Sequence, residues 1–320
     1  MANTFAPQGF LQTQGTGVTP SFELTQMAVS SSNTGAIFSG DPVMQAAGTT
    51  GLATGYITQG YAPVPVVISA IAFTATTFAN TTFTITAITS GVPTSPNAWA
   101  PPVGSILSIG AGSYFATGGS FQGNFTVNSS TTTTIVATSG LGTTTGSTTY
   151  TGTYNAGTSY VYVPVVGVFD GCKYLSTSQK RVVWSNYYPG SDANTAAAVT
   201  ANVINDPLAQ FTVQTGNSNT TATAVGITNI GLNATFNYSQ SGASPATVNG
   251  NTANGLSTMF LDQYLIGNSE FLPFKILSLP GYSPDGNNPF STTQNNDYTA
   301  AYGNVIAGFN NMQLKQLRGV

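Results

Sequence analysis

The side chains that most often carry out catalysis or bind metals are scarce in this sequence. Its 320 residues include no histidine and a single cysteine, Cys172. Without histidine the chain lacks the commonest general base and metal ligand, which excludes Ser-His-Asp and Cys-His catalysis and histidine-containing zinc sites. Lys173 follows Cys172 and could lower the pKa of the thiol. The neighbouring residues are typical of a strand, however, and we expect a buried, unreactive thiol.

Carboxylates are the other side chains that could support catalysis or hold a metal. The chain has nine acidic residues, and a glycosidase needs two of them to converge across a cleft. No motif singles out such a pair, so we expect no catalytic residues. Residues 283–288, with Asp297 farther along the chain, offer oxygen ligands for calcium. Their Asp-Gly and Asn-Asn pairs are turn residues first, and we expect a plain loop, no metal and no cofactor.

Charged residues make up only 5% of the sequence, against roughly 25% in an ordinary soluble protein. The surface must therefore consist mostly of Thr, Ser, Asn, Gln and Gly. Such groups cost less to desolvate than charges and suit permanent burial against a neighbour. The six basic residues, of which only Lys180 and Arg181 are adjacent, do not form a phosphate-binding surface, so we expect no nucleic-acid partner.

No segment is typical of a membrane span or an export signal. The apolar run 64–73 contains Pro65 and Ser69 and falls short of the roughly 20 residues that cross a bilayer. The first residues lack a basic region followed by an apolar one, so we expect no Sec signal. One cysteine forms no internal disulfide, and the fold does not depend on an oxidising compartment. An uncharged, secretion-like composition without an export signal suits a protein that is made in a cytoplasm and released inside a particle, and we expect no membrane partner.

The distribution of charge divides the chain into two kinds of sequence. Residues 42–169 contain no charged side chain. Within this stretch polar and apolar residues alternate over 82–86 and over 123–127, the period of half-buried strands. Turn residues separate these and further strand candidates. We predict an inserted, uncharged β-domain at 62–162, either a small Ig-like β-sandwich or a barrel.

The flanking segments 36–61 and 163–320 are predicted to form a β-rich host domain of sandwich or jelly-roll type, so that the fold class is all-β. Short helices are a minor element, with candidates at 192–204 and 256–266. Residues 1–35 mix Gly, Pro, Gln, Ser and Thr with isolated aromatics, which indicates an extended arm lying on a neighbouring subunit. The predicted aromatic anchors of this arm are Phe5, Phe10 and Phe22.

Several segments resemble proteins of tailed bacteriophages. These segments are residues 1–10 (MANTFAPQGF), 38–43 (FSGDPV), 167–174 (GVFDGCKY), 183–190 (VWSNYYPG), 203–207 (VINDP) and 272–275 (LPFK). As a set they resemble a family of head structural proteins, the capsid decoration or cement proteins. The resemblance covers the segments on either side of the predicted insert and does not extend to the insert itself.

The resemblance implies a non-enzymatic virion protein that is made in the bacterial cytoplasm and binds the outer surface of the capsid. Its partner would be the major capsid protein, and it would often self-associate as a homotrimer. Aromatic side chains suit such contacts because they bury area without stripping charges of water. The predicted contact residues are Phe5, Phe10, Phe22, Trp184, Tyr187 and Tyr188.

Two other functions are compatible with the sequence. The chain could be the major capsid protein itself, although those of tailed phages typically have a long spine helix and many charges, which are not visible here. It could instead be a tail-fibre or adhesion module that binds host-surface carbohydrate through aromatics such as Trp99, Tyr150 and Tyr154. Hundreds of copies on the head would indicate a cement protein, and a few copies at the tail would indicate adhesion.

Overall fold

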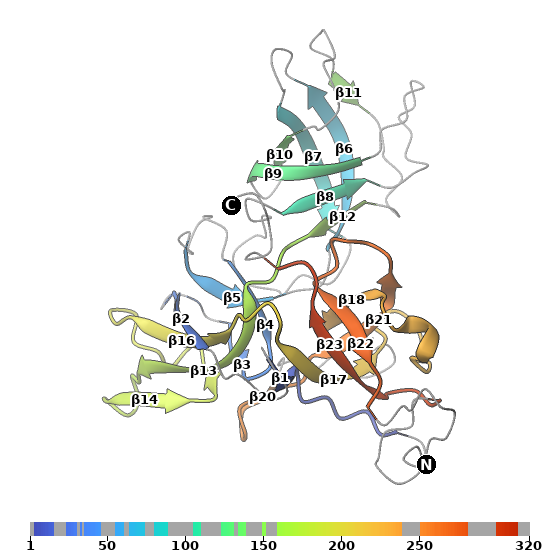
Figure 1. Cartoon of the computed structure of the whole chain (residues 1–320). Coiled ribbons are helices and arrows are strands. Elements are labelled where there is room, and N and C mark those ends of the chain that lie inside the picture. Colours follow the sequence, from blue (N-terminus) through green and yellow to red (C-terminus); the bar gives the residue numbers. More distant parts are fainter. Residues whose placement is uncertain are drawn as a thin grey trace. The chain divides into compact units, whose positions relative to one another are not determined.

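The computed structural model shows a chain built almost entirely of β-strands (Figure 1). The structure describes residues 3–15, 24–30, 33, 35–45, 55–60, 64–73, 80–88, 105–109, 123–130, 134–138, 149–151, 159–238, 250–280 and 299–312. Within these ranges the one helix is a single 3-10 turn, η1 (Ile227–Asn229). The prediction of an all-β fold is therefore confirmed.

The chain divides into two compact units. The first unit comprises Met1–Met44, Tyr56–Gly60 and Val165–Gln316, and the second comprises Gln45–Gly55, Tyr61–Pro164 and Leu317–Val320. The main segment of the second unit, 61–164, includes all of the predicted insert, 62–162. The predicted arm, residues 1–35, falls within the first unit.

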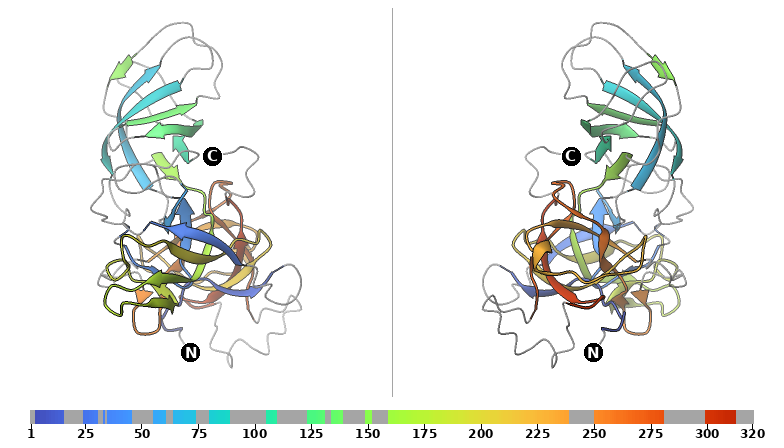
Figure 2. Two further views of the ribbon diagram at one scale, coloured as in Figure 1. Left: turned by 90° about the vertical axis from the view of Figure 1, so that its left-hand side faces the viewer. Right: turned by 90° about the vertical axis from the view of Figure 1, so that its right-hand side faces the viewer.

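The second unit contains one antiparallel sheet that closes on itself (Figure 2). Its strands are β6 (Val64–Phe73), β7 (Asn80–Ile88), β8 (Ile106–Ile109), β9 (Gly123–Ser130), β10 (Thr134–Thr138), β11 (Thr149–Thr151) and β12 (Ser159–Tyr162). They follow the order β11-β6-β12-β8-β9-β10-β7, and β7 pairs again with β6. Phe125 and Val127 are buried while Thr126 between them is partly exposed. We predicted either an Ig-like β-sandwich or a barrel for this segment. The strand pairing is that of a barrel and not of a sandwich.

One sheet of the first unit closes around a cluster of phenylalanine rings. Its strands are β1 (Leu11–Gln14), β17 (Gln210–Gly216), β18 (Asn233–Asn237), β21 (Phe260–Gly267), β22 (Phe274–Ser278) and β23 (Asn304–Phe309). β17 pairs with both β21 and β23, which completes the ring, and β1 adds to β17. The ring centroid of Phe274 lies 4.2 Å from that of Phe10 and 5.6 Å from that of Phe309. Since aromatic rings bury large apolar areas, this phenylalanine cluster supplies much of the burial that holds the sheet together.

The other large sheet of the first unit also closes, and it positions the candidate site. Its strands are β2 (Leu24–Val29), β4 (Pro42–Gln45), β5 (Ile57–Gln59), β13 (Gly167–Leu175), β14 (Val182–Ser185) and β16 (Val199–Ile204). β13 pairs with β4 as well as with β16, which closes the ring, and β14 extends the sheet from β13. Alternate residues of β16, Val199, Ala201 and Val203, lie in the core. The two short pairs are β3 (Ile37–Phe38) with β15 (Tyr187–Tyr188) and β19 (Gly250–Asn251) with β20 (Leu256–Ser257).

Neither of the two helices predicted from the sequence forms. The end of the first candidate, 192–204, is strand β16, and most of the second, 256–266, belongs to β20 and β21. Pairing of β16 with strands on both sides outweighs the preference of a few alanines for helix. The sandwich and jelly-roll forms expected for the host segments also differ from the structure. Both large sheets of the first unit close on themselves instead of facing each other as two open layers.

Candidate docking face

The first described residues are part of the barrel that holds the phenylalanine cluster. Phe10 is 1% exposed and lies inside that cluster. Phe5 packs edge-on against Phe260, with 5.5 Å between the ring centroids. Residues 3–15 therefore differ from the predicted arm, because their rings complete the core of their own chain and Phe10 has no surface left for a neighbouring subunit. The third predicted anchor, Phe22, lies outside the described residues.

Tyr187 and Tyr188, which we predicted to contact a partner, pack within the first unit. The hydroxyl of Tyr188 is buried and donates a hydrogen bond to the carbonyl of Asn33 at 2.8 Å. Burial raises the pKa of Tyr188 to about 12, so the phenol keeps its proton. Tyr187 is half-buried and stacks on Phe38, with 5.3 Å between the ring centroids. Both tyrosines thus stabilise the fold around β15.

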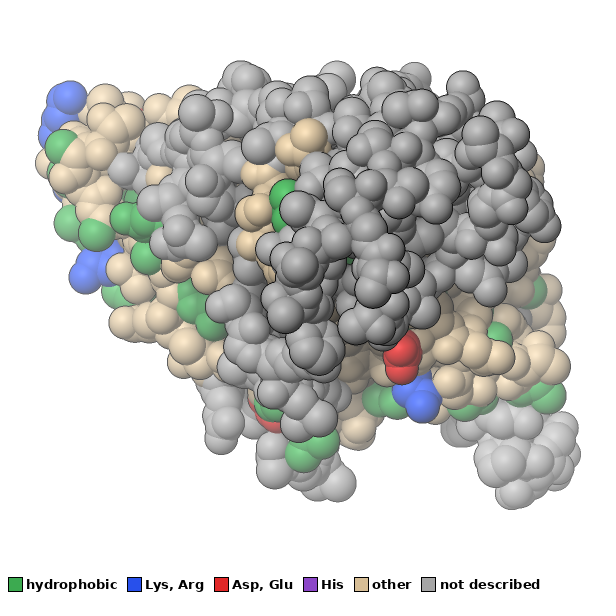
Figure 3. All heavy atoms as spheres, turned by 90° about the horizontal axis from the view of Figure 1, so that it is seen from above, with side chains coloured by type: hydrophobic (Ala, Val, Ile, Leu, Met, Phe, Trp, Pro, Cys, Tyr) green, Lys and Arg blue, Asp and Glu red, His purple; other side chains and the backbone are tan. Residues whose placement is uncertain are grey.

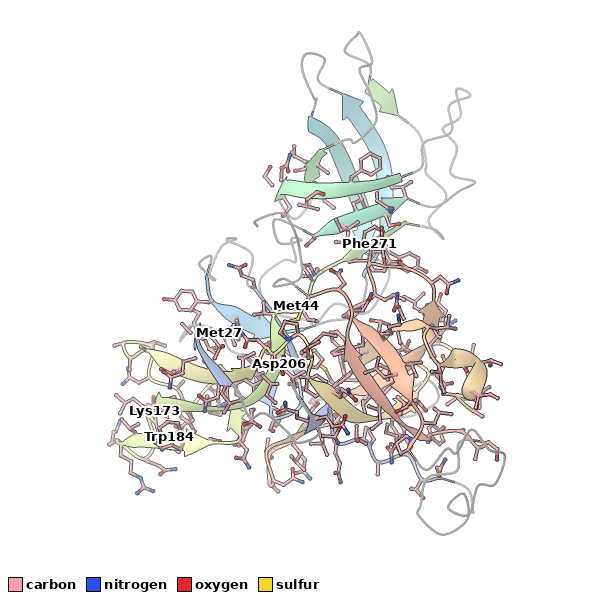
Figure 4. The ribbon with its side chains drawn as sticks, in the orientation of Figure 1. Met27, Met44, Lys173, Trp184, Asp206 and Phe271 are labelled. Atoms are coloured by element: carbon pink, nitrogen blue, oxygen red, sulfur yellow. The ribbon has the colours of Figure 1, made fainter. Side chains whose placement is uncertain are left out.

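Trp184 on β14 is the one predicted contact residue, among those described, that is mainly exposed: 65% of its surface is accessible. It lies directly opposite Lys173 on β13, and the Lys173 ammonium is 5.4 Å from the centre of the indole ring (Figure 4). Two residues before Trp184, Val182 is 53% exposed and lies opposite Leu175. Residues two apart share a face of a strand. These four side chains therefore form one exposed surface, which we call the hairpin face.

The sheet beside the hairpin face is mostly polar, and β13 adds one exposed carboxylate, Asp170. Thr200 on β16 pairs with Lys173, and Ala28 on β2 pairs with Thr200. Gln26 and Asn202 are the next pair along the same two strands. Covering Thr200, Ala28, Gln26 and Asn202 would desolvate no charge of their own, and the neighbouring Lys173 ammonium already lies against an aromatic ring.

β14 is an edge strand. Within the part of the chain that the structure describes, it pairs with β13 and with no other strand. Exposed edges in native proteins are usually protected by charged residues, proline or bulges. Residues 182–185 (VVWS) contain neither a charge nor a proline. Among the described strands none covers this edge, so its backbone groups can pair with another chain.

The hairpin of β13 and β14 also concentrates positive charge. Lys173, Lys180 and Arg181 are three of the six basic residues of the chain. The Arg181 Nε donates to the Gln179 side-chain carbonyl at 3.0 Å. Figure 3 shows blue Lys and Arg atoms at the left edge, the side on which Figure 1 places β13 and β14. The hairpin thus offers cations beside an aromatic, apolar surface.

A carboxylate holds the turn of this hairpin in place. The side chain of Asp192 accepts hydrogen bonds from the Ser176 hydroxyl at 2.6 Å and from the Ser178 backbone N–H at 2.9 Å. These hydrogen bonds, with help from the charge of Lys180, lower the pKa of Asp192. Lys180 adopts a left-handed conformation with φ 55°. The turn is therefore fixed by specific contacts, so its cations are presented from an ordered position.

A second carboxylate, Asp41, lies in the interior of the first unit and was not predicted to have a role. Its Oδ2 accepts hydrogen bonds from the Phe38 N–H at 2.8 Å and from the Gln59 side-chain amide at 2.6 Å, while Oδ1 has no hydrogen-bond partner. Burial raises the pKa of Asp41 to about 7, and hydrogen bonds from Phe38, Ser257 and Gln59 oppose that rise. The side chain is inaccessible to solvent, so it can act on stability but cannot reach a substrate.

The other residues that we considered for catalysis or ligand binding are either buried or lie outside the side chains that the structure describes. Cys172 is buried, which confirms the prediction of a buried thiol, and burial raises the pKa of that thiol to about 12. The described residues contain no group of three metal-binding side chains and no helix that could cross a membrane. The calcium candidate at 283–288 and the aromatic residues Trp99 and Tyr154 lie outside the described residues. Tyr150 lies in β11, where the structure describes only the backbone.

The hairpin face is therefore the best-supported site in the described structure, and it is suited to binding a macromolecule. The sequence analysis found Trp184 but missed Val182, which lies two residues before it on the same strand, and it missed Lys173 and Leu175, which only the sheet pairing brings to this face. Comparison with protein-family models, curated proteins and solved structures finds no match. The function must therefore be argued from this surface and from the composition of the chain.

Proposed function

We propose that this chain is a non-enzymatic virion structural protein that stabilises a phage capsid as a decoration or cement protein. The observation that carries the proposal is the hairpin face: Trp184 is 65% exposed beside an open strand edge. The resemblance of the host segments to tailed-phage head proteins supports the same function. The proposed partner is the major capsid protein, and homotrimers on the outer surface of the shell are the proposed arrangement.

The free energy available from such docking follows from the exposed area. Covering Trp184 would remove on the order of 100 Å² of largely apolar surface from water, or about 2.5 kcal/mol per copy at roughly 25 cal/mol per Å². A ligand that binds only the assembled lattice stabilises that lattice by mass action. Several linked copies multiply weak contacts through avidity. Modest docking by each protomer is therefore enough to strengthen a shell.

The experiment uses shells of the virus that encodes this chain, prepared without it. Purified wild-type protein is added, and the bound copies are measured by co-sedimentation. We expect saturable binding at high copy number, and Trp184→Ala should weaken it by roughly 50-fold, the equivalent of the area estimate. Tyr264→Ala removes another exposed aromatic, 45% accessible, and should leave binding unchanged.

The two variants make the outcome specific. If wild-type protein shows no affinity for the shells, or if both variants bind like the wild type, the proposal is wrong. Electron microscopy of intact particles gives an independent measurement. Only a few copies at the tail would favour the adhesion module considered above, while density forming the shell itself would favour the major capsid protein.

A further inference from the structure

The backbone edge of β14 can take part in recognition in a way that its side chains alone cannot. An unpaired edge presents alternating N–H and C=O groups that an extended segment of another chain can pair with, as in β-strand addition. Residues 182–185 carry no charge or proline that would prevent this pairing. In the described structure no other strand occupies the edge.

The side chains next to this edge specify which residues the added strand should carry. Val182 and Trp184 are exposed on one face, whereas Val183 between them packs partly against the core. A strand added about 4.8 Å from β14 would place alternate side chains within roughly 5 Å of Val182 and Trp184. The segment should therefore have apolar residues at alternate positions.

The charges around the edge indicate which other side chains the added strand should carry. Lys180 and Arg181 directly precede β14, and Lys173 lies across from Trp184. Carboxylates on the added strand would meet these cations, which favours association and fixes the register. A second copy of β14 has no carboxylate to bring to the edge, so it would not complement these cations.

We infer that β14 binds an extended, acidic segment of the shell protein as an added antiparallel or parallel strand, with valine-like and glutamate-like residues alternating along it. This inference rests on the proposed function, whose site it deepens by naming the binding mode and the chemistry of the partner. The backbone pairing supplies affinity that does not depend on sequence, and the pattern of apolar and acidic side chains supplies specificity.

The first test uses a fluorescent synthetic peptide in which valine alternates with glutamate. Its binding to the full chain is measured by fluorescence anisotropy, and protection of β14 is measured by amide hydrogen exchange. We expect saturable binding and slower exchange within residues 182–185. A matched peptide with lysine in place of glutamate should bind at least about tenfold more weakly. A third peptide, N-methylated at alternate amides, should not slow exchange.

Specific results would overturn the inference. Equal binding of the glutamate and lysine peptides would show that the partner need not be acidic. Equal binding of the N-methylated peptide would show that binding does not occur by strand addition. Protection of residues 182–185 that rises with protein concentration, without any peptide, would show that a second copy occupies the edge instead.

Variants connect the peptide result to the shell. Val182→Lys places a charge on the edge, and the double variant Lys180→Glu/Arg181→Glu reverses the local charge. Each should weaken both peptide and shell binding on the order of tenfold. Lys275→Glu changes an exposed lysine on β22 and serves as the matched control. If shell binding depends on Trp184 but not on these substitutions, the proposed function survives and strand addition fails. If the peptide binds as expected but the shells do not, the proposed function fails.

Discussion

The buried carboxyl of Asp41 gives the sharpest prediction about stability. Its folded-state pKa is raised from 3.8 to about 7, because the charged form is removed from water. Between these two pKa values the folded chain holds a proton that the unfolded chain has released. Stability must therefore fall as the pH rises through this window. The contribution is complete below about pH 4 and is lost above about pH 7.

The magnitude follows from the width of the window. Each pH unit within it changes the free energy of unfolding by about 1.4 kcal/mol, so the total is on the order of 4 kcal/mol. Asp41→Asn removes the titration, while the amide oxygen still accepts hydrogen bonds from Phe38 and Gln59. The new amide group takes the place of Oδ1, which has no partner. The protonated wild-type carboxyl places its O–H at the same partnerless position, so the two proteins carry a comparable cost wherever Asp41 is protonated.

These terms predict a pH-dependent difference between Asp41→Asn and the wild type. The two proteins should have similar stability near pH 4, and the variant should be more stable near pH 8. The test is urea unfolding, followed by circular dichroism at several pH values for both proteins. Asp192→Asn is the control: hydrogen bonds lower the pKa of this carboxyl, so its stabilising effect is present at neutral pH and is lost on acidification. A free-energy difference between Asp41→Asn and wild type that stays constant from pH 4 to pH 8 would refute the reasoning.

Three further predictions concern packing. Gly250→Ala should destabilise the first unit by about 1–3 kcal/mol, because an added Cβ would overlap the Phe38 ring. Gly226→Ala is the control and should be nearly neutral in the same unfolding assay, since the space around Gly226 is open. Phe274→Ala should cost about 3–5 kcal/mol, since Phe274 contacts several rings of the phenylalanine cluster; a loss under 1 kcal/mol would contradict that packing. Cys172 should react with a thiol reagent only in denaturant, and fast modification of the folded protein would show that the thiol is not buried as described.

The strand content of the chain could be predicted because it is encoded locally. In β9 the alternation of Phe125, Thr126 and Val127 is visible in the sequence and recurs as alternating burial. Closure of the sheets could not be predicted in this way, because it depends on pairs far apart in the chain, such as β17 with β23. The failed helix at 192–204 has the same origin. Asp192, the first residue of the predicted helix, instead binds the turn at Ser176 and Ser178 through its carboxylate.

The candidate site was predictable only in part. Trp184 was selected because a large aromatic in a charge-poor chain suits an interface. Strand periodicity also implies that Val182 shares its face, but not which face of β14 is exposed. That choice is made by Val183, which packs against a core assembled from distant segments. Asp41 likewise accepts hydrogen bonds from Gln59 and Ser257, which no local pattern connects to it.

In a chain with so few charges, the use made of each charge is informative. Asp41, Asp192 and Asp262 all accept hydrogen bonds from backbone N–H groups of their own unit, as Asp262 does from Ser218 and Tyr264. These carboxylates serve the fold. The hairpin cations Lys173 and Arg181 instead contact an exposed indole and a glutamine side chain, interactions worth about 1 kcal/mol or less at a surface. The charge of Lys180 already acts on Asp192, whereas the weak contacts of Lys173 and Arg181 leave both cations able to meet the carboxylates of the proposed acidic strand.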